Sequence, residues 1–360
     1  MRDRLDVLCL GNYRGIGGAQ RSAALLTGEF ARRGYAAGLG FLFEREPLTH
    51  PHSFVLAPCK PITPREWWQF GAAIEREIIA RRPRIIIGFF PLANIIGAIA
   101  ARRLPGARLL ATQRNPANRQ HWLTGPLDHL LGATGAYHAN IAVSHSVAAS
   151  FARHSPRYRA RLHVIHNAAP PLPHATASAR APTPIIGCVA RLHPQKNLGF
   201  ALDVLRLHPS AQLHLAGTGP DEALLRRRAH ALGLAARVHL AGPLAGPDLA
   251  RFYAGLDLLL HCSAYEGFGL VLVEAMAAGV PVLAGDLPVN REIGGNAPLY
   301  LPFHAPLWAA AIDRLAAPGP ARDRAIAAGH ARAAQFSVDA MVERYLALAA
   351  LPARATALTP

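Results

Sequence analysis

Residues 263–282, SAYEGFGLVLVEAMAAGVPV, contain two glutamates eight positions apart, Glu266 and Glu274. An apolar run, DLLLHC, precedes them, and the pattern predicts a buried strand, a loop with Gly267 and Gly269, and then a helix. The N–H groups at the start of a helix favour an anion, and glycines let a ligand approach the backbone. Ionised carboxylates only accept hydrogen bonds, so they suit hydroxyl groups. The stretch therefore indicates a ligand with phosphates and hydroxyls, such as a sugar nucleotide; the alternative is an N-cap glutamate followed by a solvent-facing one.

A second corner of the same kind occurs in RLHPQKN, residues 191–197, where Arg191 leaves a predicted strand and Lys196 begins a predicted helix. Two cations at a strand-to-helix corner can hold a diphosphate. The alternative is two solvated cations. Because both corners belong to one predicted sheet, we expect them to lie at the same edge of it and to share one ligand.

Apolar strands alternate with helical patterns along most of the chain, which predicts parallel sheets built from βαβ units. The alternation stops in a stretch rich in proline and alanine and then restarts. We therefore expect an α/β protein with two doubly wound, Rossmann-like domains that face a central cleft. The predicted parts are an N-terminal acceptor domain at 1–172, a linker at 173–184, a sugar-nucleotide domain at 185–334, and a C-terminal helix and tail at 335–360 that could pack back on the first domain.

The composition is that of a globular protein, with 360 residues of which 51% are hydrophobic and 17% charged. The four cysteines are far apart and lack zinc-binding spacing, so we expect a reducing, cytoplasmic location without a disulfide framework. We expect no signal peptide. The most apolar run, residues 85–100, contains Pro91 and Asn94 and is short for a membrane span, so it predicts a strand, a loop and the start of a helix.

The formal net charge of +16 attracts nucleic acids, anionic lipids or phosphorylated ligands. The excess is mostly scattered arginine, without a basic tail or a basic–aromatic recognition motif, so nucleic acid is not an expected partner. Residues 60–84 place Trp67 and Trp68 among arginines, which is typical of a lipid interface. This segment predicts peripheral attachment to an anionic surface, the inner face of the cytoplasmic membrane. The alternative is that both tryptophans pack between helices.

Several of these motifs resemble glycosyltransferase family 4, whose members are retaining enzymes with the two-Rossmann GT-B fold. EGFGLVLVEAMAAGVPV matches the E-x7-E signature of that family, with Glu266 and Glu274 as its glutamates. ARLHPQKN is similar to its Arg-x4-Lys segment, and GGAQRSAALLTGEFARRG resembles its first loop and helix. The resemblance covers residues 5–295 and is stronger in the C-terminal half than in the N-terminal half.

The resemblance implies a role for each candidate residue. Arg191 and Lys196 would bind the donor diphosphate and stabilise it as it leaves, Glu266 would contact the transferred sugar, and Glu274 would hold the ribose. Further substrate contacts are expected at glycines and backbone N–H groups, namely Gly17, Gly18, Gly217, Phe268, Gly269 and Leu270. No metal or other cofactor is expected, because two cations and a helix N-terminus neutralise the leaving group. Retention would follow from same-face attack, with a donor phosphate oxygen taking the acceptor proton.

One stretch departs from the family pattern. Many members have a histidine near the reacting sugar, whereas ATQRNPANRQHW, residues 111–122, places Arg114 and Asn115 there. Both are expected to contact substrate, with a structural ion pair as the alternative for Arg114. His121 lies nearby but is not an expected catalytic residue. The loop GIGG lacks the third glycine of the dinucleotide fingerprint, which argues against NAD as a ligand.

The resulting hypothesis is a retaining glycosyltransferase that moves a sugar from a nucleoside diphosphate sugar to a glycan or a polyprenyl-linked acceptor. The family most often uses UDP-linked donors, and the process would be bacterial surface polysaccharide synthesis. One alternative is a catalytically degenerate subunit that only binds sugar nucleotides. Another is a sugar-nucleotide epimerase of the same fold, which should lack the corner with two glutamates.

Overall fold

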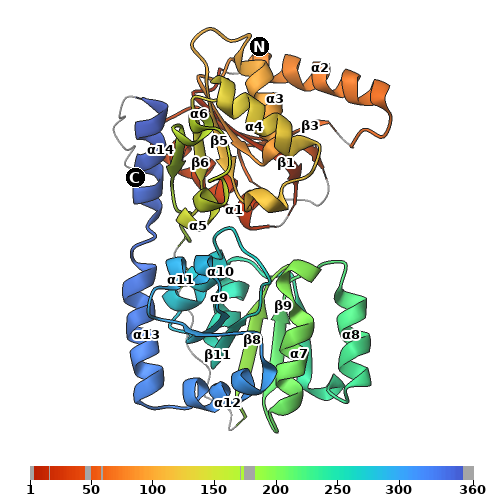
Figure 1. The fold of residues 1–360 in the computed structure, drawn as a ribbon, viewed down its shortest axis with the longest axis vertical. Helices are drawn as coiled ribbons and strands as arrows, with labels where there is room; N and C mark the ends of the chain where they lie inside the picture. The colour runs from red at the N-terminus through yellow and green to blue at the C-terminus, as the bar shows by residue number, and fades with distance from the viewer. Residues whose placement is uncertain are drawn as a thin grey trace. The chain divides into compact units, whose positions relative to one another are not determined.

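The computed structural model describes residues 4–15, 17–44, 50–57, 60–170, 172–173 and 183–351 of the chain. It forms two α/β units, and each is considered by itself (Figure 1). Unit 1 contains residues 1–168 together with 338–360, and unit 2 contains residues 169–337. Most of the predicted linker, residues 174–182, lies outside the described residues. Each unit has its own parallel sheet, so the expectation of two doubly wound α/β domains is confirmed.

The sheet of unit 1 has seven parallel strands in the order β3-β2-β1-β4-β5-β6-β7. Parallel neighbours need crossover connections, and most of these are helices. The strands are β1 (Val7–Arg14), β2 (Ala37–Glu44), β3 (Ser53–Ala57), β4 (Ile85–Phe89), β5 (Arg108–Gln113), β6 (Ala139–Ala142) and β7 (Leu162–Val164). The helices are α1 (Gly18–Arg32), α2 (Pro64–Arg81), α3 (Pro91–Ala101), α4 (Thr124–Thr134), α5 (His145–Ser150), α6 (Pro156–Arg159) and α14 (Val338–Ala349), with a 3-10 turn η1 (Ala117–Arg119).

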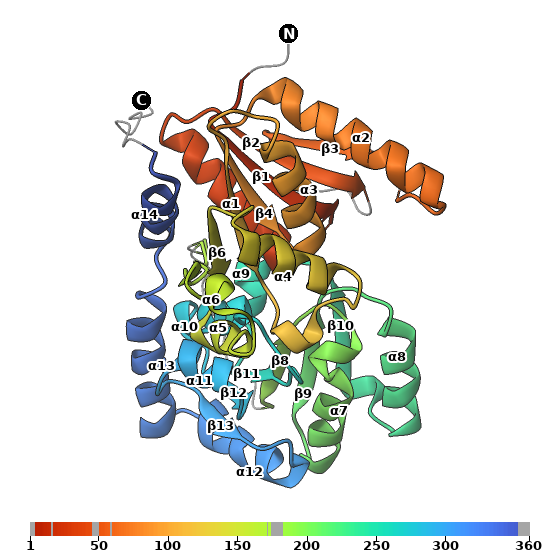
Figure 2. The ribbon, with the colours of Figure 1, turned by 45° about the horizontal axis from the view of Figure 1, so that its top comes forward.

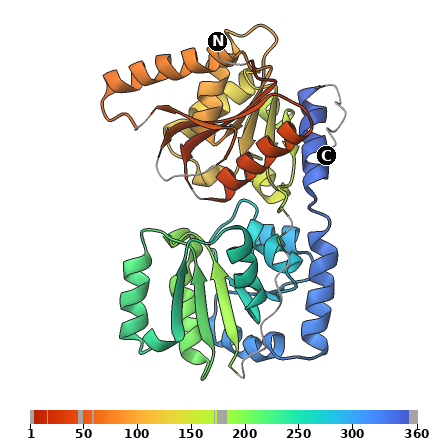
Figure 3. The same cartoon turned by 180° about the vertical axis from the view of Figure 1, so that it is seen from behind.

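Helices cover both faces of this sheet, which explains why its strands are apolar without alternation. In β1, Val7 and Cys9 belong to the apolar cluster shared with α1 and α14, whereas Leu8 and Leu10 belong to the cluster shared with α2 and α3. Figures 1 and 3 show the two faces, with α3 and α4 on one and α1 on the other. Figure 2 shows α2, α3 and α4 in one layer, and α3 packs against both of its neighbours.

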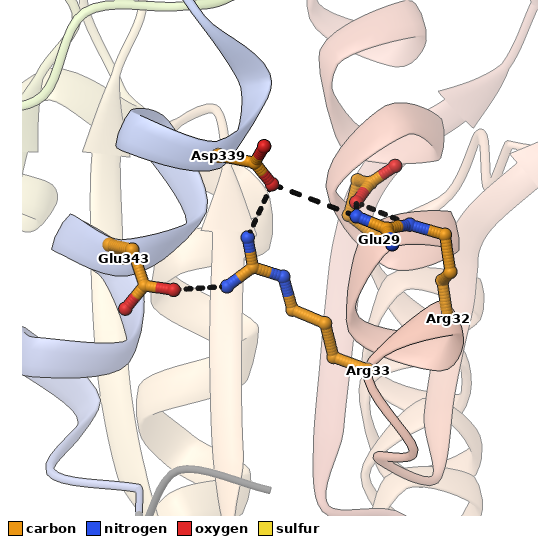
Figure 4. A network of polar contacts seen from close by, with 5 residues as sticks. All are labelled: Glu29, Arg32, Arg33, Asp339 and Glu343. Carbon is orange, nitrogen blue, oxygen red and sulfur yellow. Dashed lines mark hydrogen bonds and ion pairs between the residues drawn. The ribbon is translucent and has the colours of Figure 1, made fainter. Parts of the chain in front are cut away.

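Helix α14 packs in unit 1, although it follows unit 2 in the sequence. Its buried side chains Val342 and Tyr345 join the apolar cluster of α1 and the strands. At the rim of this contact, the guanidinium of Arg33 pairs with Glu343 and, at 2.7 Å, with Asp339 (Figure 4). Both carboxylates are mostly exposed, so we expect the apolar contact to stabilise the docked helix more than the ion pairs do.

Unit 2 has a six-stranded parallel sheet in the order β10-β9-β8-β11-β12-β13. Its apolar core includes residues of β8, β9, β11 and α7, and Trp308 of α12 is fully buried in it. The strands are β8 (Ile185–Val189), β9 (Gln212–Ala216), β10 (Val238–Gly242), β11 (Leu258–His261), β12 (Val282–Gly285) and β13 (Leu299–Leu301). The helices are α7 (Leu198–Leu207), α8 (Glu222–Ala231), α9 (Gly246–Ala254), α10 (Leu270–Ala277), α11 (Pro288–Gly294), α12 (Ala305–Ala316) and α13 (Pro320–Ala333), with 3-10 turns η2 (Pro194–Lys196) and η3 (Ala235–Arg237).

The apolar run at 85–100 forms β4 and most of α3, so the predicted strand and helix are both present, and the predicted loop between them is the single residue Phe90. Among the described helices, none combines the length and the apolar character that crossing a membrane requires. Cys9, Cys188 and Cys262 are buried free thiols, and Cys59 lies outside the described residues.

We predict that Val342→Ala destabilises unit 1 by about 2 kcal/mol, because Val342 is fully buried and its truncation leaves a void. Asp339→Ala should lower the free energy of unfolding by less than about 1 kcal/mol, because it removes only ion pairs of an exposed carboxylate. Urea unfolding followed by circular dichroism compares the two variants. A larger loss of stability in Asp339→Ala would contradict this account of how α14 docks.

Candidate functional site

The corner between β11 and α10 contains the two glutamates that the sequence singles out. Strand β11 ends at His261 and α10 begins at Leu270, so residues 262–269 form the connecting loop. Gly269 is the N-cap residue and has a φ of 85°, a left-handed conformation that favours glycine. No side chain caps this helix start. The first N–H groups of α10 are therefore available to an anion, as its sequence predicts.

Glu266 is buried, with 8% of its side chain exposed, and its Oε1 lies 2.5 Å from the Nζ of Lys196. Lys196 ends η2, the turn that follows β8. Two further contacts join the loops: the N–H of Ala264 donates to the carbonyl oxygen of Gln195 at 2.9 Å, and Gln195 Nε2 donates to the carbonyl oxygen of Tyr265 at 3.1 Å. The structure thus brings the two predicted corners together. Lys196, which the sequence predicts to bind a diphosphate, pairs here with the carboxylate of Glu266.

The environment of this pair keeps Glu266 ionised. Burial by itself would raise the pKa of Glu266, but the Lys196 ammonium, the nearby His261 and a hydrogen bond from Ser263 outweigh burial and lower it. The Nε2 of His261 lies 3.6 Å from Glu266 Oε1. Burial lowers the pKa of His261 to about 4, against the opposing effect of Glu266. At neutral pH Glu266 is therefore a carboxylate and His261 a neutral imidazole.

Glu274 lies within α10 and is almost fully buried, with 1% of its surface exposed. Its Oε2 accepts a hydrogen bond of 2.9 Å from the hydroxyl of Tyr253, which belongs to α9. The alternative of a solvent-facing helical glutamate is therefore wrong. The alternative of Glu266 as an N-cap residue is also wrong, because Gly269 occupies that position.

The other predicted residues of unit 2 differ in their surroundings. Arg191 is exposed and forms no hydrogen bond or ion pair with the part of the chain that the structure describes. Gly217 has a φ of 135°, and a Cβ there would collide with the carbonyl oxygen of Ala190, so backbone packing alone requires this glycine. The side chain of Phe268 is buried edge-to-face on Phe336, with ring centroids 5.5 Å apart. Any ligand contact of Phe268 therefore falls to its backbone.

The remaining predicted residues belong to unit 1. Gly17 is the N-cap of α1 and Gly18 its first residue, and the extended φ of Gly17, −172°, does not demand glycine.

Arg114 follows β5 and is buried, with its guanidinium carbon 4.8 Å from the centre of the Phe89 ring. Burial lowers its pKa, and the Tyr345 hydroxyl opposes this effect. No described carboxylate pairs with Arg114, so the structural ion pair proposed as its alternative is wrong. Asn115 beside it is half-buried.

Sequence reasoning missed four residues of the corner: His261, Ser263, Tyr253 and Gln195. His261 directly precedes the loop, and its place at the end of a predicted strand was a signal that could have identified it. Tyr253 and Gln195 bond to residues that are 21 and 70 positions away in the sequence, so no local sequence pattern identifies them. Chemically, the corner offers a helix N-terminus and the Lys196 ammonium for an anion, and two carboxylates that can accept hydrogen bonds from hydroxyls. The structure does not bring the exposed Arg191 side chain into contact with them.

Comparison with curated proteins gives partial matches. The D-inositol 3-phosphate glycosyltransferase of Mycobacterium marinum is 36% identical over 139 residues, which are 36% of this chain and 30% of that protein. The protein of the same name from Mycobacterium leprae is 34% identical over 173 residues, which are 45% of this chain and 40% of that protein. The matched stretches therefore span less than half of these relatives.

Solved structures match over nearly the whole chain. Anabaena Alr3699/HepE, in complex with UDP and glucose, has a TM-score of 0.80 at 20% identity and covers 97% of this chain and all of that one. WaaG, a glycosyltransferase involved in lipopolysaccharide biosynthesis, has a TM-score of 0.71 at 17% identity and covers 94% of this chain and 98% of that one. The shared architecture is the GT-B fold, as expected from the sequence.

Two family models match the chain on either side of the predicted linker. The model described as Glycosyltransferase Family 4 matches residues 16–171, and the model described as Glycosyl transferases group 1 matches residues 175–332. Because the two matches together cover most of both units, the chain belongs to glycosyltransferase family 4.

Proposed function

We propose that the protein transfers a sugar from a nucleoside diphosphate sugar to a hydroxyl group of an acceptor. The observation that carries this proposal is the pair of the buried Glu266 with the partly buried Lys196 beside the uncapped start of α10. A buried ion pair costs desolvation energy and is weak evidence for stability alone, so a role in ligand binding is the better explanation. The relatives named glycosyltransferases support the same conclusion.

In the proposed complex, the donor diphosphate binds at the N-terminus of α10 with Arg191 and Lys196. Lys196 exchanges the Glu266 carboxylate for a phosphate oxygen, which leaves Glu266 able to accept hydrogen bonds from the transferred sugar. Glu274 accepts hydrogen bonds from the ribose hydroxyls while its Oε2 also accepts the hydrogen bond from the Tyr253 hydroxyl. The cations would stabilise the charge that develops on the leaving diphosphate.

The base and the stereochemistry are also proposals. Alr3699/HepE was solved with UDP and with UDP-glucose, which supports UDP as the carrier. We propose retention of configuration by same-face attack, with a phosphate oxygen of the donor receiving the acceptor proton. Arg191, Lys196 and the α10 start supply positive charge at the leaving group, so we propose that no metal is required.

The acceptor is proposed to be a glycan or a polyprenyl-linked sugar, and the process surface polysaccharide synthesis. The structural neighbour WaaG is a glycosyltransferase involved in lipopolysaccharide biosynthesis. The relatives named D-inositol 3-phosphate glycosyltransferases favour a second acceptor class, a small phosphorylated polyol. In either case we propose that Arg114 and Asn115 of unit 1, with the Gly17–Gly18 loop, contribute to substrate binding. A degenerate binding subunit and an epimerase of the same fold remain as alternatives.

We predict that UDP raises the melting temperature of the protein and that GDP and ADP do not. Lys196→Ala should abolish this shift, because it removes the ammonium that meets the diphosphate. The chain has only two lysines, so Lys60→Ala is a matched control that should keep the shift. Differential scanning fluorimetry of the three proteins measures it. If no nucleotide stabilises the wild type, the donor-site assignment is wrong.

We predict that His261 makes the protein acid-sensitive. The pKa of His261 is about 4 in the folded protein, whereas the ordinary value for histidine, which applies to the unfolded chain, is 6.5. As the pH drops from 6.5 to 4, the unfolded chain therefore binds a proton that the folded protein does not, and the free energy of unfolding decreases. The full effect is about 3 kcal/mol. His261→Gln should lose correspondingly less stability over this range, as measured by urea unfolding at pH 7 and pH 4.5. His230→Gln, at an exposed position, is the control, and equal pH dependence in both variants would refute a buried neutral His261.

A further inference from the structure

Helix α4 departs from the usual polarity of a surface helix, although its Leu131 packs against the apolar core. On its inner side Gly125, Asp128 and Gly132 are buried, whereas Leu127 and Leu130 are 42% and 56% exposed. A surface helix normally turns its apolar side chains to the core and its charged ones to solvent. This feature lies outside the donor corner and does not depend on the proposed transfer reaction.

Buried hydrogen bonds hold α4 in this orientation. The carboxylate of Asp128 accepts hydrogen bonds from Asn94 Nδ2 at 3.0 Å, Gln113 Nε2 at 2.8 Å and the Tyr137 hydroxyl at 3.0 Å. A Cβ on Gly132 would lie 2.6 Å from the ring of Tyr158, so this side of the helix has no room for a larger side chain. Rolling the helix to bury its leucines would leave a buried carboxylate without partners, which is costly.

The exposed side of α4 forms an apolar stripe that consists of Trp122, Leu123, Leu127 and Leu130. The three leucines follow the i, i+4, i+7 spacing that puts side chains on one face of a helix. Trp122 directly precedes them and is 75% exposed. Scattered exposed leucines are common, but three exposed leucines at the spacing of one helix face, directly after an exposed tryptophan, indicate a surface that another apolar phase covers.

The chain segment around this stripe is strongly basic. From Ile78 to Ala168 the sequence has twelve arginines and one acidic residue, and that residue is the buried Asp128. Arg102, at the end of the neighbouring helix α3, and Arg119, in η1, are both exposed. An apolar partner for α4 must therefore also be anionic at its rim.

We infer that the apolar stripe docks on a bilayer surface with anionic headgroups. Leucine and tryptophan side chains would enter the boundary between headgroups and acyl chains while the arginines meet lipid phosphates. A second copy of the same face fits poorly, because it would bring the arginines of residues 78–168 against one another, and the single carboxylate of that range is the buried Asp128. Nucleic acid would satisfy the arginines but not the leucines.

This assignment moves the membrane contact away from residues 60–84. In that segment Trp67 is partly buried and packs edge-to-face on Phe70 at 5.5 Å, so it offers less surface to lipid than Trp68 does. The alternative that both tryptophans pack between helices is wrong for Trp68, which is 74% exposed. Arg81 pairs with Glu77 at 2.9 Å, which reduces the positive charge that α2 presents to lipid. Trp68 is still exposed and gives the experiment its second arm.

Vesicle flotation of the full chain tests the inference, with phosphatidylcholine vesicles compared to vesicles that also contain phosphatidylglycerol. We expect the wild type to float with the anionic vesicles only, and less as salt increases. Leu127→Gln/Leu130→Gln should lower the vesicle partition coefficient at least about ten-fold. The matched control is Leu207→Gln/Leu224→Gln, which changes two exposed leucines of unit 2 and should leave binding unchanged.

Three outcomes would overturn the inference. The first is no flotation of the wild type. The second is unchanged flotation of the α4 variant with loss in Trp68→Gln, which would assign the contact to α2. The third is a wild-type dimer in analytical ultracentrifugation that the α4 variant abolishes, which would assign the stripe to self-association. A circular dichroism melting curve of the α4 variant confirms that it is folded, and none of these measurements needs a nucleotide, so their result is separate from that of the donor experiment.

Discussion

The ion pair between Lys196 and Glu266 is the interaction on which the candidate site depends. It holds together two loops that leave different strands of one sheet, and it keeps a carboxylate ionised in a buried position. Two charges brought out of water are stabilised only if their geometry is good, and the loss of either leaves the other unpaired. The pair thus joins the two loops within the chain itself, which reduces the cost of ordering them around a ligand.

The two units use buried carboxylates in different ways. In unit 2, a cation neutralises Glu266, so a competing anion such as a diphosphate can change the pairing. In unit 1, three neutral donors satisfy Asp128, and no charge is available for exchange. The first arrangement suits a site that responds to a ligand, and the second suits a fixed structural support, here for the orientation of α4.

Much of the fold could be predicted from the sequence, because buried parallel strands are short apolar runs and each ends at a recognisable loop. Strands β7 and β13 could not, since they have three residues each and lack a distinct pattern. At the site, the spacing of Glu266 and Glu274 identified the corner, but not that Lys196 would pair with Glu266. That contact joins residues 70 positions apart, and only the sheet order brings them together. Gly217 is predicted as a binding residue, but a Cβ at this position would collide with the backbone of Ala190, so packing requires glycine there whether or not it contacts a ligand.

The most direct test of the central claim is the rate of sugar transfer by Glu266→Gln, measured beside its affinity for UDP. Glutamine keeps the size of the side chain but removes the charge that holds Lys196. If the corner is the donor site of a transferase, transfer from the UDP-sugar should fall at least about 100-fold, by analogy with the loss of one oxyanion-hole donor. UDP should still bind, since Lys196 no longer has a competing partner. Unchanged transfer in this variant would mean that the pair is a structural support and that the chemistry lies elsewhere.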